Sequence, residues 1–399
     1  MHYGSRSVGE MSARERIDAV WHRRKPDRVP WSPMLGDSLL RSTPSYWNRL
    51  TPEQKFAIQH DYKYPSLVSL PNALGFQEAF LWEMTQDVGG AIIAGVSTVD
   101  AIDEQIETGV DRVSNTETNF RVHTPWGDLQ ETVSGDCSAE TVYRTRFLIS
   151  ERHAYSTVAR LIEQRQYHAR YDRFVQKQAM LGERGACMVT APDQPLISLF
   201  RVRNPVDLLF DLADEPDRMG ELLDLLHIRA REAYRLIAQG PGHAVMTGAA
   251  FMTTRLISPR LFERYVLPYL AEYADIIHSA SKILLCHMCG HIRALLPMLQ
   301  EARIDGIESL TNPPIGDTTF EEFFQVLGAQ AVLCSGIDVT RLLSCTPEQL
   351  QDHTRDILRR THGHHMILAT ADEVPYGTSL ENLRVVAQTI EQGETEWSD

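Results

Sequence analysis

The chain has 399 residues, a length that fits two or three average domains or one large α/β barrel. Its 43% hydrophobic and 23% charged residues are typical of a globular protein and exclude collagen-like, disordered and disulfide-stapled classes. The net charge of -14 excludes a general attraction to nucleic-acid phosphates, so no nucleic-acid partner is expected.

The N-terminal half is expected to hold helices and one β region. Ser12 and Glu15 have the spacing of a capping box, which predicts a helix from Ser12 to Arg24 within an N-terminal extension of residues 1–28. From about residue 98 to 135, β-branched residues alternate with polar ones, which predicts a small antiparallel insertion. Cap and turn signals predict a strand entered at Asp27 to Trp31, a helix opened by Thr51-Pro52-Glu53, a long polar helix from about Ala154 to Gln178, and helices begun by Asn204-Pro205 and Glu215-Pro216.

From His243 onward, strands and helices alternate regularly. The expected strands are Ala244 to Thr247, Ile283 to Cys286, Gly306 to Leu310, Ala331 to Cys334 and Met366 to Ala369. The helices that follow them run from Ser258-Pro259 to about Ala280, from about His291 to Ala302, from a capping box at Thr318 and Glu321, from Thr346-Pro347, and from about Ser379 to Gln392. Consecutive strand-helix units of this kind indicate parallel strands with right-handed crossovers.

Such a run fits either a doubly wound sheet or an eight-stranded barrel, and the length favours the barrel. The chain contains neither G-x-G-x-x-G at a helix start nor a P-loop, so a nucleotide cofactor is not indicated. We therefore predict an α/β fold in which residues 1–399 form a single TIM (β/α)8 barrel domain, with the helical extension and the β insertion added to it.

The cysteines and the N-terminus indicate a compartment. Six cysteines are too few for a disulfide framework in a chain of this length, which favours a reducing environment. Met1 to Glu10 has no apolar run behind it, and no stretch approaches 18 apolar residues. We therefore expect a cytoplasmic protein without a membrane partner.

Metal-ligand side chains follow the later strands, where the functional residues of a barrel lie. His287 and Cys289 follow the second of these strands, Glu308 ends the third and Asp372 follows the fifth. Imidazole, thiolate and carboxylate are zinc ligands, so we predict a metal site formed by these four residues, with Cys334 as an alternative ligand. The alternative is that the cysteines are small buried hydrophobic residues and that His287 is a hydrogen-bonded core residue.

Two further groups of residues are singled out. The motif His362-Gly363-His364-His365 also resembles a metal site, but it lies on the helix-to-strand side of a barrel and is interpreted as a polar turn. The residues expected to contact a substrate, because they follow strands, are Asp37, Met252, Asn312 and Asp338.

Short motifs along nearly the whole chain resemble the uroporphyrinogen decarboxylase superfamily. In order they are Arg14-Glu15-Arg16, Pro26-Asp27-Arg28-Val29-Pro30, Thr124-Pro125-Trp126-Gly127, Ile257-Ser258-Pro259 with Leu267-Pro268-Tyr269, His287-Met288-Cys289-Gly290, Pro313-Pro314-Ile315-Gly316-Asp317, Gly336-Ile337-Asp338 and Glu381-Asn382-Leu383. The resemblance implies a single TIM barrel with the active site at the carboxyl ends of the strands.

The resemblance is closest to one branch of the superfamily, the zinc methyltransferases that serve corrinoid proteins. The decarboxylase branch has an arginine-rich loop after its first strand, whereas residues 31–37 here contain no arginine. The methyltransferase branch has a His-x-Cys pair, which His287 and Cys289 match, and a later cysteine, which is replaced here by Asp372. Glu308 is similar in placement to a glutamate of cobalamin-independent methionine synthase, a distant relative.

The exchange of a thiolate for a carboxylate makes a bound zinc harder and more Lewis-acidic, which suits activation of an ether oxygen or an amine-type leaving group. We therefore hypothesise a zinc-dependent methyltransferase that moves a methyl group between a small methylated substrate, such as a methoxy compound, and a corrinoid protein. Glu308 and Asp372 would have catalytic roles, with Asp372 either as fourth ligand or as proton acceptor. The chain lacks a D-x-H-x-x-G corrinoid motif, so the corrinoid would be carried by the partner.

Two alternatives remain open. One is a metal-independent decarboxylase of a smaller tetrapyrrole or aromatic acid, with Asp37 and Asp338 as acid/base groups. The other is a non-catalytic corrinoid- or porphyrin-binding protein, because a fold alone does not fix a function.

Overall fold

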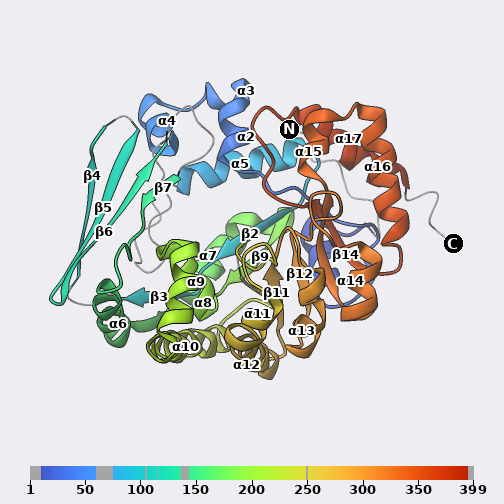
Figure 1. Cartoon of the computed structure of the whole chain (residues 1–399). Helices are drawn as coiled ribbons and strands as arrows, with labels where there is room; N and C mark the ends of the chain where they lie inside the picture. Colours follow the sequence, from blue (N-terminus) through green and yellow to red (C-terminus); the bar gives the residue numbers. More distant parts are fainter. Residues whose placement is uncertain are drawn as a thin grey trace.

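Eight parallel strands curl into a nearly closed barrel in the computed structural model, which describes residues 10–59, 75–103, 106–114, 116–135, 143–248 and 250–393 (Figure 1). In hydrogen-bonded order the strands are β1 (Trp31–Ser32), β14 (His365–Thr370), β13 (Val332–Ile337), β12 (Gly306–Glu308), β11 (Ile283–His287), β10 (Ala244–Thr247), β9 (Gly185–Thr190) and β2 (Ile92–Val96). The amide of Ala91 donates to the carbonyl of Trp31 at 2.6 Å, which links the two edges of the sheet. The predicted TIM barrel is thereby confirmed.

Helices surround the strands, and an amphipathic helix packs its apolar face against a sheet. Those that follow β9 to β14 are α8 (Pro195–Val202), α9 (Pro205–Asp214), α10 (Pro216–Gln239), α11 (Pro259–Tyr265), α12 (Leu267–Ser279), α13 (Leu296–Glu301), α14 (Phe320–Leu327), α15 (Val339–Ser344), α16 (Pro347–Arg360) and α17 (Leu380–Gly393). A 3₁₀ turn at Gly182–Arg184 precedes β9, and another at Arg293–Leu295 precedes α13. Earlier in the chain are α2 (Asp37–Ser42), α3 (Pro44–Trp47), α4 (Pro52–Gln59), α5 (Gly75–Asp87), α6 (Ala154–Gln164) and α7 (Tyr171–Leu181).

The N-terminal helix α1 (Ala13–Trp21) closes the end of the barrel where the strands begin. Its predicted capping box is confirmed, because the Glu15 amide donates to Ser12 Oγ at 3.0 Å and the Ser12 amide donates to the Glu15 carboxylate at 2.6 Å. Ile17, Val20 and Trp21 are buried in one apolar cluster with side chains from inside the barrel. The N-terminal extension is therefore packed into the core of the barrel.

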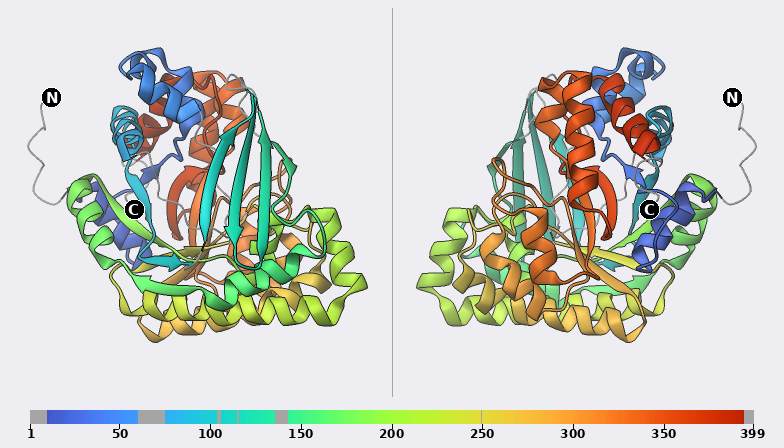
Figure 2. Two further views of the ribbon diagram at one scale, coloured as in Figure 1. Left: turned by 90° about the vertical axis from the view of Figure 1, so that its left-hand side faces the viewer. Right: turned by 90° about the vertical axis from the view of Figure 1, so that its right-hand side faces the viewer.

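The predicted β insertion forms a four-stranded antiparallel sheet of β4 (Glu107–Arg112), β5 (Glu117–Thr124), β6 (Gly127–Ser134) and β7 (Tyr143–Arg146). The sheet stands beside the barrel, on the side away from α16 and α17 (Figures 1 and 2). It extends beyond the expected end near residue 135, and β3 (Val99–Ile102) pairs not with it but with β8 (Gln166–Ala169).

Three local predictions are wrong. The long helix from Ala154 to Gln178 is two helices, α6 and α7, separated by β8, because residues 166–169 pair with β3 and Arg165 forms a buried ion pair with Asp103 at 2.5 Å. The helix from Ser258 to Ala280 is broken at Val266, two residues before a proline, into α11 and α12. The capping box of α14 uses Thr319 and Glu322, one residue later than expected.

The described cysteines are free, namely Cys187, Cys286, Cys289, Cys334 and Cys345, whereas Cys137 lies outside the described residues. In the part of the chain that the structure describes, none of the helices is long and apolar enough to cross a membrane.

Candidate functional site

His287 and Glu308 form an ion pair at the carboxyl ends of two neighbouring barrel strands. The pairing of β11 with β12 places the two residues directly opposite each other. Nδ1 of His287 donates to Oε2 of Glu308, and the hydroxyl of Ser309 donates to the other carboxylate oxygen at 2.7 Å. Glu308 is buried, so its negative charge is held by these two contacts in a site that excludes most water.

Cys289 completes a group of three around the imidazole. Burial by itself would lower the pKa of His287, but the hydrogen bonds and electrostatic interactions with Cys289 and Glu308 outweigh it and raise the pKa to about 10. The imidazole is therefore a cation at neutral pH in this arrangement. The predicted His-x-Cys pair and Glu308 thus lie at one point of the barrel rim.

These three side chains match zinc in chemistry but are not yet arranged around a metal. Among the described residues, no group of three or more His, Cys, Asp and Glu side chains is placed to hold a metal ion. The imidazole nitrogen that faces Glu308 is instead occupied by the hydrogen bond to it. Imidazole, thiolate and carboxylate are the donors that zinc accepts, so loading would require that the metal replace this hydrogen bond.

Cys334 lies beside the group but in a different environment. It is the register partner of Glu308 on β13 and packs in the apolar cluster inside the barrel. Burial, followed by the charge of Glu308, raises the pKa of its thiol well above the ordinary value. A thiol that stays protonated is a poor ligand, so Cys334 is the weaker of the two cysteines as a candidate.

The two predicted aspartates on the later strands have local contacts. Asp372 is exposed in the turn after β14, and its Oδ1 accepts the amide of Glu373 at 2.7 Å. Asp338 is the N-cap of α15, where it accepts the amide of Thr340 at 2.9 Å and its hydroxyl at 2.8 Å. Neither contact involves His287, so the structure gives Asp338 a helix-capping role and leaves Asp372 outside the group of three.

The remaining predicted substrate residues are dispersed around the rim. Asp37 is the first residue of α2, after β1, and is half-buried. Asn312 is half-buried in the loop after β12, and its Oδ1 is buried without a hydrogen-bond partner among the described residues. Met252 is fully buried in the main core and packs beside Gly248. Asn312 is the member of this set with an unused polar group.

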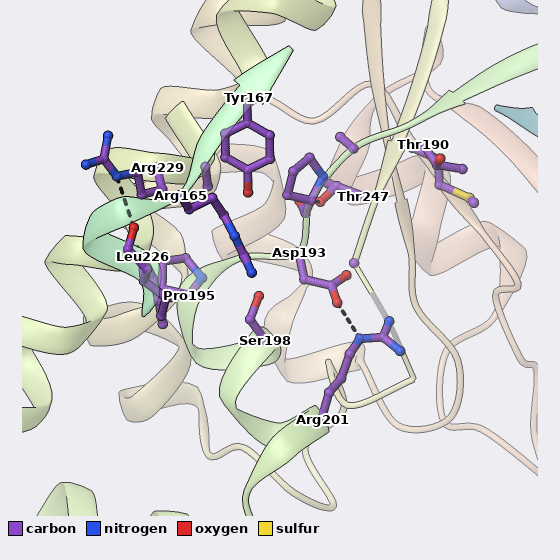
Figure 3. A pocket seen from close by; sticks show the side chains of 16 residues that line it. Arg165, Tyr167, Thr190, Asp193, Pro195, Ser198, Arg201, Leu226, Arg229 and Thr247 are labelled. Atoms are coloured by element: carbon purple, nitrogen blue, oxygen red, sulfur yellow. Dashed lines mark hydrogen bonds and ion pairs between the residues drawn. The ribbon is translucent and has the colours of Figure 1, made fainter. Parts of the chain in front are cut away.

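A cavity of about 380 Å³ opens at the carboxyl ends of β9 and β10, and β10 is the neighbour of β11 (Figure 3). Its lining combines apolar residues with an equal number of polar or charged ones, and convergent polar groups in a concave pocket are typical of a small-molecule site. The polar and charged residues in the lining are Arg165, Tyr167, Thr190, Asp193, Ser198, Arg201, Arg229 and Thr247. Figure 3 shows the side chains of Arg165, Ser198 and Asp193 pointing into the same space.

Asp193 and Arg201 form the one ion pair between two lining residues that the described structure shows. Nε of Arg201 donates to Oδ2 of Asp193 at 2.5 Å. Burial raises the pKa of Asp193, while the charges of Arg201 and His287 oppose the rise. Asp193 therefore lies within electrostatic range of His287, which connects the cavity to the group of three.

Gly248 brings the cavity wall against His287. Its φ of +93° is rare for residues with a side chain, and an added Cβ would lie 3.0 Å from the His287 carbonyl oxygen. The turn after β10 can approach β11 this closely because it has no side chain at this position.

The sequence pattern does not predict Asp193 and Arg201 as site residues, because β9 lies outside the regular strand-helix repeat. Residues 185–190 form a buried strand followed by a proline-rich turn that contains Asp193. An apolar run that ends in Pro192-Asp193 is a strand signal, but it stands apart from the regular repeat that begins at His243.

Comparison with known proteins identifies a family and one curated relative. Residues 189–393 match the family described as Uroporphyrinogen decarboxylase (URO-D). A curated protein described as methylated-thiol–coenzyme M methyltransferase, from Methanosarcina mazei, is 32% identical over 160 residues. That match covers 40% of this chain and 40% of the relative, so less than half of either protein is aligned.

Solved structures support the fold. A structure described as a methyltransferase from Methanosarcina mazei superposes with a TM-score of 0.60 and 12% sequence identity. The superposition covers 96% of this chain and 99% of the other. At this identity the likeness concerns the fold alone.

Proposed function

The chain belongs to the uroporphyrinogen decarboxylase family, and from that premise we propose that it is a methyltransferase acting between a small methylated substrate and the corrinoid of a separate protein. The partial likeness to a curated methyltransferase supports the reaction class. The corrinoid partner, the zinc ion and a methoxy-type substrate are parts of the proposal.

One observation carries the proposal: His287, Cys289 and Glu308 meet at the barrel rim beside a cavity of about 380 Å³. These three residues would hold the zinc, and Asp372 would join them only if the turn after β14 moves inward. When bound, zinc supplies a Lewis acid that polarises the heteroatom bearing the methyl group.

The transfer itself is a displacement at the methyl carbon. The bond between the methyl carbon and the donor heteroatom breaks, both electrons stay on the heteroatom, and the heteroatom then takes up a proton. The methyl group is passed to the reduced corrinoid, which supplies the electron pair of the new bond. This chain must therefore position the donor, exclude water and stabilise the charge that develops on the leaving heteroatom.

Asp193 and Arg201 are the residues that we propose position the methyl donor. Their ion pair lies in the cavity wall within electrostatic range of His287, and the Arg201 side chain is 34% exposed. Within the described part of the chain, Arg201 makes no other side-chain hydrogen bond, so its terminal nitrogens are free to donate to a substrate. An arginine there would also stabilise negative charge on the leaving group.

Metal analysis of the purified protein tests the ligands. We expect about one zinc per chain in the wild type, and loss of that zinc in His287→Ala and Cys289→Ala. Cys345→Ala is the matched control, because Cys345 is a free, half-buried cysteine at the end of α15 and far along the chain from the group. Stoichiometric zinc that persists in both site variants would contradict the proposed ligands.

A transfer assay tests the reaction. Reduced free cobalamin serves as the acceptor and methoxylated aromatic acids serve as donors, and the change in the cobalamin absorption spectrum reports methylation. We expect transfer that stops on chelation and is absent in His287→Ala. Carbon dioxide release from aromatic acids in the presence of chelator, without cobalamin methylation, would favour the decarboxylase instead.

A further inference from the structure

A second cavity, of about 510 Å³, lies at the end of the barrel opposite to His287. Its walls come from the segment between α1 and β1, from the turn between α16 and β14, and from the last turn of α17. Since the first two of these segments lead into β1 and β14, the cavity faces the amino ends of the strands, whereas His287 ends a strand. We call it the basic cavity and define it by its main lining residues, Arg24, Lys25, Asp27, Arg28, Val29, Leu358, His362, His364, His365, Met366 and Ile390.

The lining of this cavity is positively charged, although the protein as a whole is negatively charged. The chain carries a net charge of -14, but the lining holds three cations, Arg24, Lys25 and Arg28, against the single carboxylate of Asp27. Asp27 is already neutralised, because Arg16 donates to its two oxygens at 2.7 and 2.8 Å. The lining therefore presents an excess of positive charge.

Two of the cations have no partner of their own. Arg28 lies 3.6 Å from Glu10. In the described ranges, the guanidinium of Arg24 and the ammonium of Lys25 make no hydrogen bond or ion pair, and both side chains are exposed at the cavity mouth. An anion in the mouth would gain charge-assisted hydrogen bonds without breaking an existing pair.

Behind the cations the walls are apolar and aromatic. Val29, Leu358, Met366 and Ile390 supply aliphatic surface. The ring of His364 stacks on Phe324 with centroids 3.7 Å apart, and its buried Nδ1 has no hydrogen-bond partner among the described residues. Burial lowers the pKa of His364, so its ring is neutral at pH 7 and acts as apolar surface with one unused polar atom.

We propose that the basic cavity binds a small organic anion with an apolar body of about one or two rings and a carboxylate, sulfonate or phosphate head. The head lies against Arg24 and Lys25, and the body lies between His364 and the aliphatic wall. The volume suits a molecule of this size. The motif His362-Gly363-His364-His365, which resembles a metal site in sequence, thereby becomes part of an anion site; no metal-holding cluster occurs in the described chain.

The test uses 8-anilinonaphthalene-1-sulfonate as the probe, on the full chain, by fluorescence titration and calorimetry. We expect saturable binding of about one probe molecule per chain and an increase in the melting temperature, because the folded state binds it. The uncharged analogue N-phenyl-1-naphthylamine shares the rings but lacks the sulfonate. Its affinity is expected to be lower by about tenfold or more if the cations hold the head.

Charge reversal locates the site. The double variant Arg24→Glu with Lys25→Glu is expected to weaken probe binding by about tenfold or more. The matched control reverses Arg235 and Arg260, exposed cations on α10 and α11, which changes the net charge equally. An equal loss in both double variants, or no loss in either, would overturn the proposal.

Truncation of the chain distinguishes two possible occupants of the basic cavity: a ligand from solution and the last residues of the chain. Residues 394–399, which follow Gly393, include a tryptophan and three acidic residues. The titration is therefore repeated on a chain that ends at Gly393. Unchanged affinity supports a ligand from solution, whereas a clear rise in affinity would overturn that assignment in favour of the chain's own last residues.

Discussion

Replacing Gly248 by alanine tests how closely the cavity wall is fitted to His287. Gly248 has a φ of +93°, at which alanine is expected to cost about 1–3 kcal/mol in backbone strain. The added Cβ would also lie 2.9 Å from Met252 Sδ and 3.0 Å from the His287 carbonyl oxygen. The sulfur can move, but the oxygen belongs to a barrel strand, so overpacking adds about 1–3 kcal/mol.

The variant Gly328→Ala separates the cost of backbone strain from the cost of overpacking. Gly328 has a φ of +92°, and a Cβ there would meet no described atom within 4 Å, so this variant carries the strain alone. The free energy of unfolding is measured by urea denaturation for both variants and the wild type, and zinc content is measured alongside. We expect Gly248→Ala to be the more destabilising by about 1–3 kcal/mol and to bind less zinc. Equal destabilisation of the two variants would refute the argument for close fit.

Three further predictions concern other parts of the molecule. Burial raises the pKa of Glu131 from 4.5 to about 7, although Arg144 opposes the rise. The folded state thus keeps a proton that the unfolded chain releases, so stability is full below pH 4.5 and falls by up to about 3 kcal/mol as pH rises through 7. Urea unfolding at several pH values should show this fall in the wild type and not in Glu131→Gln; parallel curves would disprove it. Trp21→Ala should cost about 3–5 kcal/mol, because the side chain is 2% exposed in the closed end of the barrel, and a loss within about 1 kcal/mol in thermal unfolding would count against that role. Arg201→Lys should lower kcat/KM for methyl transfer by about tenfold or more with little change in melting temperature, and unchanged kinetics would remove Arg201 from substrate binding.

The sequence by itself determined the barrel and predicted three residues, His287, Cys289 and Glu308, that the structure brings together at its rim. The strands β10 to β14 are short apolar runs separated by capped helices, and such signals are local, so they are readable without the fold. The same pattern put Glu308 one strand away from the His-x-Cys pair, and the structure shows His287 and Glu308 directly opposite each other. The His-x-Cys spacing then placed Cys289 beside them.

Only the tertiary structure decided the features that depend on partners distant in sequence. Residues 166–169 have the polarity of an exposed helix and become a strand because β3 lies beside them. Asp372, expected as a metal ligand, accepts a hydrogen bond within its own turn, whereas Asp193, in the loop after β9, lies within electrostatic range of His287. The basic cavity is likewise assembled from segments more than 300 residues apart along the chain. Local pattern fixes which element a segment prefers, whereas burial, charge pairing and cavities arise from contacts that no local window contains.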